Sequence, residues 1–300
     1  MDAATHRPSL SADQLVDVTE AAIHFGIETI RLTGGEPLLR PDLPELVRRI
    51  SQLACPEPGG RAPGLDLALT TNGHLLAGLA DSLARAGLKR VNVSLDSLRP
   101  DRFRTITGNG SPEGVLAGLR AAKQAGLSPI KVNVVVVRGL NDDEVLEIVD
   151  FAGEAGYHAR FIEFMPLDGR HGWLPDAMVP VGEVKARIES RYALTPLPAG
   201  DGPGDEYLAD GGPMRVTLIG AVTRPFCQRC NRLRVTADGF LRSCLFSCEE
   251  LDLLPALTEP DGREALAAAF RAAIASKPAG HRIGHADFVR PLRAMSAIGG

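Results

Sequence analysis

Four of the five cysteines gather in the last third of the chain, and their spacing is typical of a metal site. Cys227 and Cys230 form a CxxC pair, which puts two thiolates on one turn, and Cys244 follows after thirteen intervening residues. With Cys248 as a fourth ligand the site would hold a structural zinc ion; with three thiolates, one iron of a four-iron cluster would stay open to a substrate. Unligated core cysteines are a third interpretation. Cys55 stands alone beside a turn-rich stretch and is expected to be an ordinary residue.

Four arginines surround these cysteines: Arg224, Arg229, Arg232 and Arg234. One or two cations would offset the charge of the thiolates, so part of this density has an ordinary structural explanation. Arg232 and Arg234 alternate along a predicted strand and therefore face the same side. Two guanidinium groups placed in this way suit a polyphosphate, because guanidinium binds phosphate oxygens in a bidentate manner.

Polar residues also stand at or beside the ends of segments that the sequence predicts as strands. They are Thr33–Pro37 with two adjacent glycines, Thr70–Gly73, Ser94–Asp96 and Lys131. Each has an ordinary explanation: a strand-to-helix turn, an Asn-Gly turn, a capping aspartate, and a lysine that extends its ammonium to water. Because the strand ends of a (β/α) barrel meet at one mouth, the four together predict a ligand site there.

The elements that would place these residues repeat one pattern, an amphipathic helix, a glycine and a short apolar strand. Ser11 and Gln14 form a capping box at the start of the first helix, and a glycine such as Gly26 ends each helix at low cost. The predicted strands lie near residues 28–33, 66–71, 90–95, 130–137 and 159–165. Continuously apolar strands that alternate with helices predict an α/β fold with a parallel sheet. We favour a (β/α) barrel over an open doubly wound sheet because polar residues gather at the strand ends.

This pattern divides the chain into two predicted regions. Residues 1–179 form the barrel region, and residues 180–300, which hold the cysteine cluster, form a smaller C-terminal metal-binding region. The glycine- and aspartate-rich stretch 199–213 is predicted to be a loop. It lacks the strand–glycine–helix context of a dinucleotide site.

The composition excludes several classes of protein. Of 300 residues, 44% are hydrophobic and 23% are charged, which is ordinary for a globular protein. No run reaches the roughly 18 apolar residues of a membrane span, and a net charge of −4 gives no reason to expect nucleic-acid binding. Residues 1–8 lack the pattern of a secretion signal, and an odd number of cysteines suits a reducing compartment, so we expect a cytoplasmic protein.

Taken together, these motifs resemble the radical S-adenosylmethionine enzymes, and most closely the GTP 3′,8-cyclase family, which acts first in molybdenum cofactor biosynthesis. The resemblance runs from about Leu10 to Gly300. The motifs on which it rests are Ile30–Arg40 (IRLTGGEPLLR), Leu69–Gly73 (LTTNG), Val91–Asp96 (VNVSLD), Arg160–Leu167 (RFIEFMPL) and Pro225–Arg234 (PFCQRCNRLR). The last of these, with Cys244-Leu-Phe and the Gly299-Gly300 end, is the most specific.

The resemblance implies a role for each matching residue. Cys227, Cys230 and Cys244 would bind an auxiliary 4Fe-4S cluster whose open iron meets the guanine ring of GTP, which leaves Cys248 outside the site. The residues implied in GTP binding are Arg31, Thr70, Lys131, Arg232, Arg234 and the backbone of Leu233. Those implied in binding S-adenosylmethionine are Gly35, Ser94 and Met165. The tail, Gly299 and Gly300, would reach into the active site during the catalytic steps.

The resemblance also implies a fold and a reaction. The fold would be a (β/α) barrel of the radical S-adenosylmethionine type. The reaction converts GTP to (8S)-3′,8-cyclo-7,8-dihydroguanosine 5′-triphosphate by a 5′-deoxyadenosyl radical mechanism. An electron donor and the next enzyme of the molybdopterin pathway would be partners, and we also consider a homodimer.

The N-terminal part departs from the family pattern. The family carries a CxxxCxxC loop after its first barrel strand, whose thiolates hold a second 4Fe-4S cluster that cleaves S-adenosylmethionine, whereas the first cysteine here is Cys55. We therefore expect a truncated chain, a partial barrel without its first strand, that keeps the substrate side but does not start the radical reaction alone. Two other interpretations stay open: a relative without that cluster that binds GTP or a partner protein, and a zinc-stabilised α/β protein.

Overall fold

The computed structural model describes residues 7–53, 65–108, 110–167, 173–200, 202–259, 262–291 and 293–298. The strands of the main sheet are β1 (Thr29–Leu32), β2 (Asp66–Thr71), β3 (Arg90–Ser94), β4 (Ile130–Val136), β5 (His158–Glu163), β6 (Leu194–Pro196), β7 (Asp205–Ala209) and β8 (Arg215–Ile219). They lie in the order β1-β2-β3-β4-β5-β8-β7-β6. Strands β1 to β5 and β8 pair in parallel, and β6 and β7 are antiparallel.

Helices follow the parallel strands in the predicted alternation. They are α1 (Ala12–His24), α2 (Leu43–Ser51), α3 (Leu76–Arg85), α4 (Pro100–Thr107), α5 (Pro112–Gln124), α6 (Val145–Ala155) and α7 (Val181–Glu189), with short 3-10 turns η1 (Pro37–Leu39), η2 (Asp142–Glu144) and η3 (Pro175–Ala177). The predicted capping box is present, since Ser11 Oγ accepts from the Gln14 amide at 3.2 Å and Gln14 Oε1 accepts from the Ser11 amide at 2.9 Å. Gly156 ends α6 with a φ of 71°, a conformation that glycine adopts without strain.

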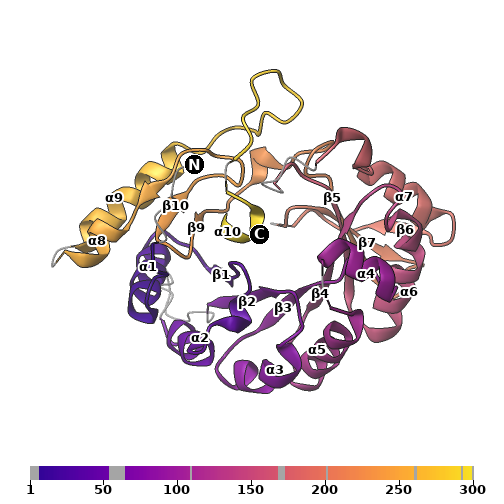
Figure 1. Ribbon diagram of the computed structural model, residues 1–300, viewed down its shortest axis with the longest axis horizontal. Helices are drawn as coiled ribbons and strands as arrows, with labels where there is room; N and C mark the ends of the chain where they lie inside the picture. The colour runs from indigo at the N-terminus through magenta and orange to yellow at the C-terminus, as the bar shows by residue number, and fades with distance from the viewer. Residues whose placement is uncertain are drawn as a thin grey trace.

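The main sheet is a partial barrel. Figure 1 shows its strands in an arc with α1, α2, α3, α5, α6 and α7 outside it, whereas a doubly wound sheet carries helices on both faces. In the described part of the chain, no strand pairs with the outer edge of β1 or of β6, so the barrel is not closed. These observations confirm the predicted α/β class and partial barrel. The proposed division at residue 179 stays a prediction, although β8, from beyond it, pairs directly with β5.

The prediction of a loop over residues 199–213 was wrong, because β7 lies within it. Pairing with β6 and β8 satisfies the backbone of β7 on both sides, and Tyr207 and Ala209 are buried. A Cβ atom added at Gly204 would lie 2.5 Å from the Leu218 carbonyl oxygen, so a glycine there permits the close approach of the two strands. Glycine therefore marks a packing contact here, and it marks no turn.

Burial along β4 alternates, and this alternation decides which side chains face the interior of the barrel. Val132 and Val134 are buried in the apolar core between the sheet and the helices. Lys131 and Asn133, which alternate with them, are half-buried and face the opposite side, the concave interior. Strand β4 therefore buries one face in apolar packing and presents polar groups on the other, whereas β2, β3 and β5 each bury three consecutive residues, as predicted for strands buried on both faces.

The C-terminal part carries a second, three-stranded sheet of β9 (Arg234–Val235), β10 (Phe240–Arg242) and β11 (Leu251–Asp252), with the 3-10 turn η4 (Cys227–Arg229) before it and α8 (Leu254–Thr258), α9 (Gly262–Ala275) and α10 (Met295–Ile298) after it. A separate apolar cluster joins Val18 of α1 with Leu241 of β10 and Phe270 of α9. This packing fixes the cysteine-bearing hairpin against the first helix of the barrel. Among the described residues, we find no helix with the length and apolarity to cross a membrane.

Candidate active site

A cluster of cations faces the interior of the partial barrel. Its members, called the cation cluster below, are Arg31 on β1, Arg90 on β3, Lys131 on β4, Arg160 on β5, and Arg232 and Arg234 at the start of β9. Burial, together with repulsion from Arg31, lowers the pKa of Arg160 to about 10, and burial with repulsion from Arg232 does the same for Arg234. Arg31 keeps some contact with water, but the protein around it removes part of its hydration. This desolvation and repulsion from Arg90 lower the pKa of Arg31 to about 10 as well. The cluster therefore brings together positive charges that repel one another.

Few acidic groups offset this positive charge. Asp66 lies near Arg31 but already forms an ion pair with Arg90, at 2.5 Å between Oδ2 and Nη2. Glu206 favours the charged forms of Lys131 and Arg160, but burial outweighs it and lowers the pKa of both. The described part of the protein thus holds more positive charge at this site than its own carboxylates balance.

Two arginines of the cation cluster have buried N–H groups without a partner. The Nε atoms of Arg160 and Arg234 are inaccessible to water and form no hydrogen bond in the structure. Arg160 donates only from Nη1, to Asn133 Oδ1 at 3.2 Å, and the residue is 5% exposed. An unpaired buried donor costs about 1–3 kcal/mol, so these groups fit an anionic ligand that accepts from them.

A threonine and a phenylalanine complete the surroundings of the cation cluster. Thr70, near the end of β2, accepts a hydrogen bond from Asn92 Nδ2 at 3.1 Å, and Asn92 is 1% exposed. The guanidinium of Arg232 lies 4.7 Å from the centre of the Phe226 ring, which holds this long side chain in place. By contrast, Arg224 is exposed and forms an ion pair with Asp205 at 3.3 Å, so it belongs to the surface.

The glycine-rich loop after β1 is held by Glu36. Its Oε1 accepts from the Leu38 amide at 3.0 Å and from Thr71 Oγ1 at 2.6 Å, and its Oε2 accepts from the Asn72 amide at 2.8 Å. Glu36 therefore acts as a clamp between the ends of β1 and β2. Gly34 has a φ of 123°, which only glycine adopts readily, and it leads directly to Gly35.

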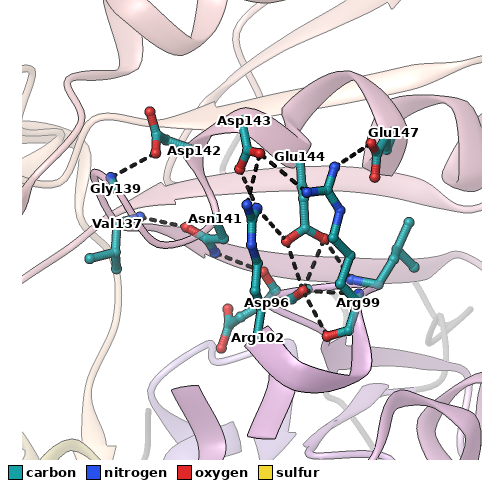
Figure 2. A network of polar contacts seen from close by, with 12 residues as sticks. Asp96, Arg99, Arg102, Val137, Gly139, Asn141, Asp142, Asp143, Glu144 and Glu147 are labelled. Atoms are coloured by element: carbon teal, nitrogen blue, oxygen red, sulfur yellow. Dashed lines mark hydrogen bonds and ion pairs between the residues drawn. The ribbon is translucent and has the colours of Figure 1, made fainter. Parts of the chain in front are cut away.

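The ends of β3 and β4 are joined by a buried polar network (Figure 2). Glu144 is fully buried and accepts from Ser97 Oγ and from the Leu98 amide, at 2.8 and 2.9 Å. Asp96 Oδ1 accepts from the Val135 amide at 2.8 Å, and burial raises the pKa of this carboxyl to about 6. The network fixes the loop that follows Ser94, so the last residue of β3 has a defined position at the mouth.

The three cysteines predicted as ligands lie on two adjacent segments, called the three-thiol segment below. Cys227 and Cys230 are the first residue of η4 and its C-cap, and the Cys230 amide donates to the Cys227 carbonyl at 3.1 Å. The pairing of β9 with β10 sets Arg234 opposite Arg242 and so brings the Cys244 segment alongside. Both Cys230 and Cys244 act electrostatically on Arg234. All three thiols are free and half-buried, whereas Cys248 is exposed.

The chemistry of the three-thiol segment fits a thiolate-bound iron–sulfur cluster. Burial would raise the pKa of Cys230, but the Arg232 amide and the charges of Arg232 and Lys277 outweigh burial and lower it, which favours the thiolate. Among the described residues, no three His, Cys, Asp or Glu side chains are arranged to hold one metal ion. In a four-iron cluster each thiolate binds a different iron, so the three thiols need not converge on one metal ion.

The described end of the chain lies inside the arc of strands. Figure 1 shows α10 there, the Met295 amide donates to the Leu167 carbonyl at 3.0 Å, and Ile298 is fully buried. Arg293, just before α10, forms ion pairs of 2.9 Å with Asp238 and with Glu250. Gly299 and Gly300 lie outside the described residues.

Comparison with known proteins agrees with this fold. The Radical SAM superfamily profile matches residues 3–152, and the profile named Molybdenum Cofactor Synthesis C matches residues 157–283. A solved structure of SuiB from Streptococcus suis, bound to its precursor peptide SuiA, superposes with a TM-score of 0.51 at 17% identity, over 61% of this chain and 39% of that one. This likeness concerns the fold alone, and with the profile it defines a radical S-adenosylmethionine protein.

Closer relatives narrow the class. The GTP 3′,8-cyclase of Streptomyces coelicolor is 47% identical, over 97% of this chain and 84% of that protein. The GTP 3′,8-cyclase of Moorella thermoacetica is 44% identical, over 98% and 88%. The chain belongs to the GTP 3′,8-cyclase family, as the resemblance predicted.

The structure brings together most residues that the sequence singled out. Arg31, Lys131, Arg232 and Arg234 all join the cation cluster, and their role in binding stays a prediction. Sequence reasoning gave no role to Arg160, which opposes Asn133 of β4 and Thr217 of β8. A signal was present, because Arg160 interrupts an apolar strand, but the neighbours that face it come from other parts of the chain.

Proposed function

We propose that this chain binds GTP within the partial barrel and serves the GTP 3′,8-cyclase reaction of molybdenum cofactor biosynthesis. The observation that carries the proposal is the cation cluster, with its unbalanced charge and the unpaired Nε atoms of Arg160 and Arg234. A nucleoside triphosphate supplies both negative charge and acceptor oxygens to such a site. Family membership and the names of the relatives support GTP as that nucleotide.

The residues of the cluster other than Arg90, which pairs with Asp66, have proposed tasks in holding GTP. Arg31, Lys131 and Arg160, on strands of the barrel, bind the triphosphate. Arg232 and Arg234, whose guanidinium groups suit a polyphosphate, and the backbone of Leu233 contact GTP beside the three-thiol segment. Thr70, oriented by Asn92, offers its hydroxyl at the end of β2.

Cys227, Cys230 and Cys244 are proposed to hold the auxiliary 4Fe-4S cluster. When bound, such a cluster supplies an iron without a protein ligand, which is a Lewis-acidic position for a nitrogen or oxygen of the guanine ring. The protein itself lowers the pKa of Cys230 through the Arg232 amide and the charges of Arg232 and Lys277, which favours the thiolate of that ligand. Thiols that must stay reduced agree with a cytoplasmic location.

The opposite side of the mouth is proposed to bind S-adenosylmethionine. Gly35 follows the loop that Glu36 clamps, Ser94 ends the strand before the buried network of Figure 2, and Met165 follows β5. Arg293 anchors the segment before α10, and Gly299 and Gly300 are proposed to reach the substrate from there. These residues position the reactants and keep water away from a reactive site.

A second candidate function is GTP binding without cleavage of S-adenosylmethionine. It is favoured by the cysteine positions, because no CxxxCxxC motif occurs in these 300 residues and no ligands of a second 4Fe-4S cluster can be assigned among them. An electron donor and the next enzyme of the pathway are proposed partners of the cyclase, and a homodimer is also proposed. Incubation with GTP, S-adenosylmethionine and a reductant distinguishes the two functions, because only the cyclase forms 5′-deoxyadenosine and the cyclised nucleotide.

The test of the GTP site is calorimetric titration of the reconstituted protein with GTP under anaerobic conditions. Replacing both Arg232 and Arg234 by alanine is expected to weaken GTP binding by a few kcal/mol, about 100-fold, because charge-assisted hydrogen bonds are lost. Arg224→Ala is the matched control, since Arg224 flanks the same cysteines but pairs with Asp205 at the surface. Absence of GTP binding by the unmodified protein, or equal affinity of the double variant, would refute the proposal.

A further inference from the structure

Lys277 stands at the junction between α9 and the three-thiol segment. It follows the end of α9, where its amide donates to the Ile274 carbonyl at 3.2 Å. Phe270 of α9 packs in the same apolar cluster as Leu241 of β10, so the helix end has a fixed position relative to the hairpin. The half-buried lysine side chain therefore starts from a well-anchored backbone.

The ammonium of Lys277 joins the two segments that carry the cysteines. Its Nζ donates to the Arg232 carbonyl at 2.6 Å and to the Ser243 carbonyl at 2.9 Å. Arg232 is two residues beyond Cys230, and Ser243 immediately precedes Cys244. One side chain thus holds a backbone atom close to each of these two thiols.

Backbone pairing does not perform this task. The register of β9 with β10 has its last pair at Arg234 and Arg242, so the residues that lead to Cys230 and Cys244 lie beyond the paired part of the hairpin. Among the described residues, the Lys277 ammonium links the two segments beyond the paired part of the hairpin, through its hydrogen bonds to both.

We propose that Lys277 is a positioning residue of the three-thiol site, which holds Cys230 and Cys244 at the spacing that their shared ligand requires. This inference rests on the proposed role of the three thiols as cluster ligands. Lys277 itself acts through the two backbone segments and contacts no substrate atom. Groups that orient metal ligands from outside typically change metal affinity by 10- to 100-fold when they are removed.

The test measures iron and acid-labile sulfide bound by the full chain after anaerobic reconstitution, and then the rate at which a chelator removes the iron. Lys277→Met removes the charge and the donors but keeps a long side chain. We expect it to lose iron about 10-fold faster or more than the unmodified protein. Lys277→Arg keeps charge and donors, and is expected to stay within about threefold of the unmodified rate.

Lys123→Met is the matched control, because Lys123 Nζ also donates to a backbone carbonyl, that of Ala155 at 2.7 Å, between α5 and α6. Its iron retention is expected to be unchanged, with a melting temperature close to that of Lys277→Met. Should Lys277→Met fail to fold, Lys277→Gln provides the measurement, because its amide still reaches one carbonyl without the charge. We expect Lys277→Gln also to release iron faster than the unmodified protein.

The outcomes separate two kinds of failure. Equal iron retention in Lys277→Met, Lys277→Gln and the unmodified protein would overturn the role of Lys277, and so would equal losses in Lys123→Met. If the unmodified protein takes up no iron, or if Cys227→Ser retains it all, the three-thiol site itself is wrong, and the proposal for Lys277 falls with it. Faster loss of iron in Lys277→Met alone, restored in Lys277→Arg, supports the proposal.

Discussion

Replacing Arg160 by methionine is expected to stabilise the unliganded protein while weakening its binding of polyphosphate. The Arg160 guanidinium is almost completely buried, has one hydrogen bond of 3.2 Å to Asn133, and leaves Nε unpaired. Burial, and repulsion by Arg31 and other cations, lower its pKa to about 10. The side chain is therefore charged at neutral pH, and this buried charge lowers the stability of the folded state.

The size of this effect follows from the lowered pKa. One pKa unit corresponds to about 1.4 kcal/mol, so the charged form of Arg160 is disfavoured in the folded state by roughly 3 kcal/mol. Methionine is unbranched and uncharged but three heavy atoms smaller than arginine, and its introduction forfeits one hydrogen bond worth about 1 kcal/mol. A net gain of about 1–3 kcal/mol is expected, within the range found when apolar residues replace buried charges.

The assay is thermal unfolding with and without tripolyphosphate or GTP, combined with titration of each anion. The variant should unfold at a higher temperature than the unmodified protein without ligand, by roughly 2 °C or more, and gain less from added anion. Arg191→Met is the control, because Arg191 is exposed and pairs with Asp150 at the surface. Its unfolding temperature and the gain in that temperature from added anion should both change little. A variant that is less stable and binds tripolyphosphate as tightly as before would refute the reasoning.

Three further predictions concern neighbouring groups. Because Asp96 has a raised pKa of about 6, the folded state binds its proton more tightly than the unfolded state does; stability should fall as pH rises from about 4 to 6. Asp96→Asn should flatten this dependence in urea titrations, and parallel curves for both proteins would contradict the assignment. Glu163→Gln should lower the free energy of unfolding in urea by about 2–4 kcal/mol, because Glu163 is buried and accepts backbone N–H groups of Val181 and of residues 222–223. A loss below about 0.5 kcal/mol would argue against a stabilising role of these hydrogen bonds. Arg293→Gln should speed limited proteolysis of the C-terminal segment, since its ion pairs with Asp238 and Glu250 are lost, and unchanged cleavage would show that Ile298 burial suffices.

Local features of the fold were predictable because neighbouring residues determine them. The capping box of Ser11 and Gln14 formed as expected, and Gly156 ends its helix in the left-handed conformation that the pattern required. The turn between Cys227 and Cys230 likewise follows from a spacing of three residues. In such cases the partners are already adjacent in the chain, so little tertiary information is needed.

Strand β7 shows where local reasoning failed. Glycines and aspartates flank this short segment, and it is a strand because β6 and β8 supply hydrogen bonds on both sides. Glu36 shows the same limit for the site: only the close approach of the ends of β1 and β2 makes its carboxylate a clamp that accepts from Leu38, Thr71 and Asn72.

By itself, the sequence determined the helix–strand order, the three cysteines and their family, because each is encoded in short motifs of fixed spacing. Tertiary structure alone decided that Arg160 is left with an unpaired N–H, and that Lys277 reaches carbonyls 45 and 34 residues away. The physical reason is that burial and charge compensation depend on which distant segments pack together. Spacing along the chain sets which groups are available, and packing sets which of them are left without a partner.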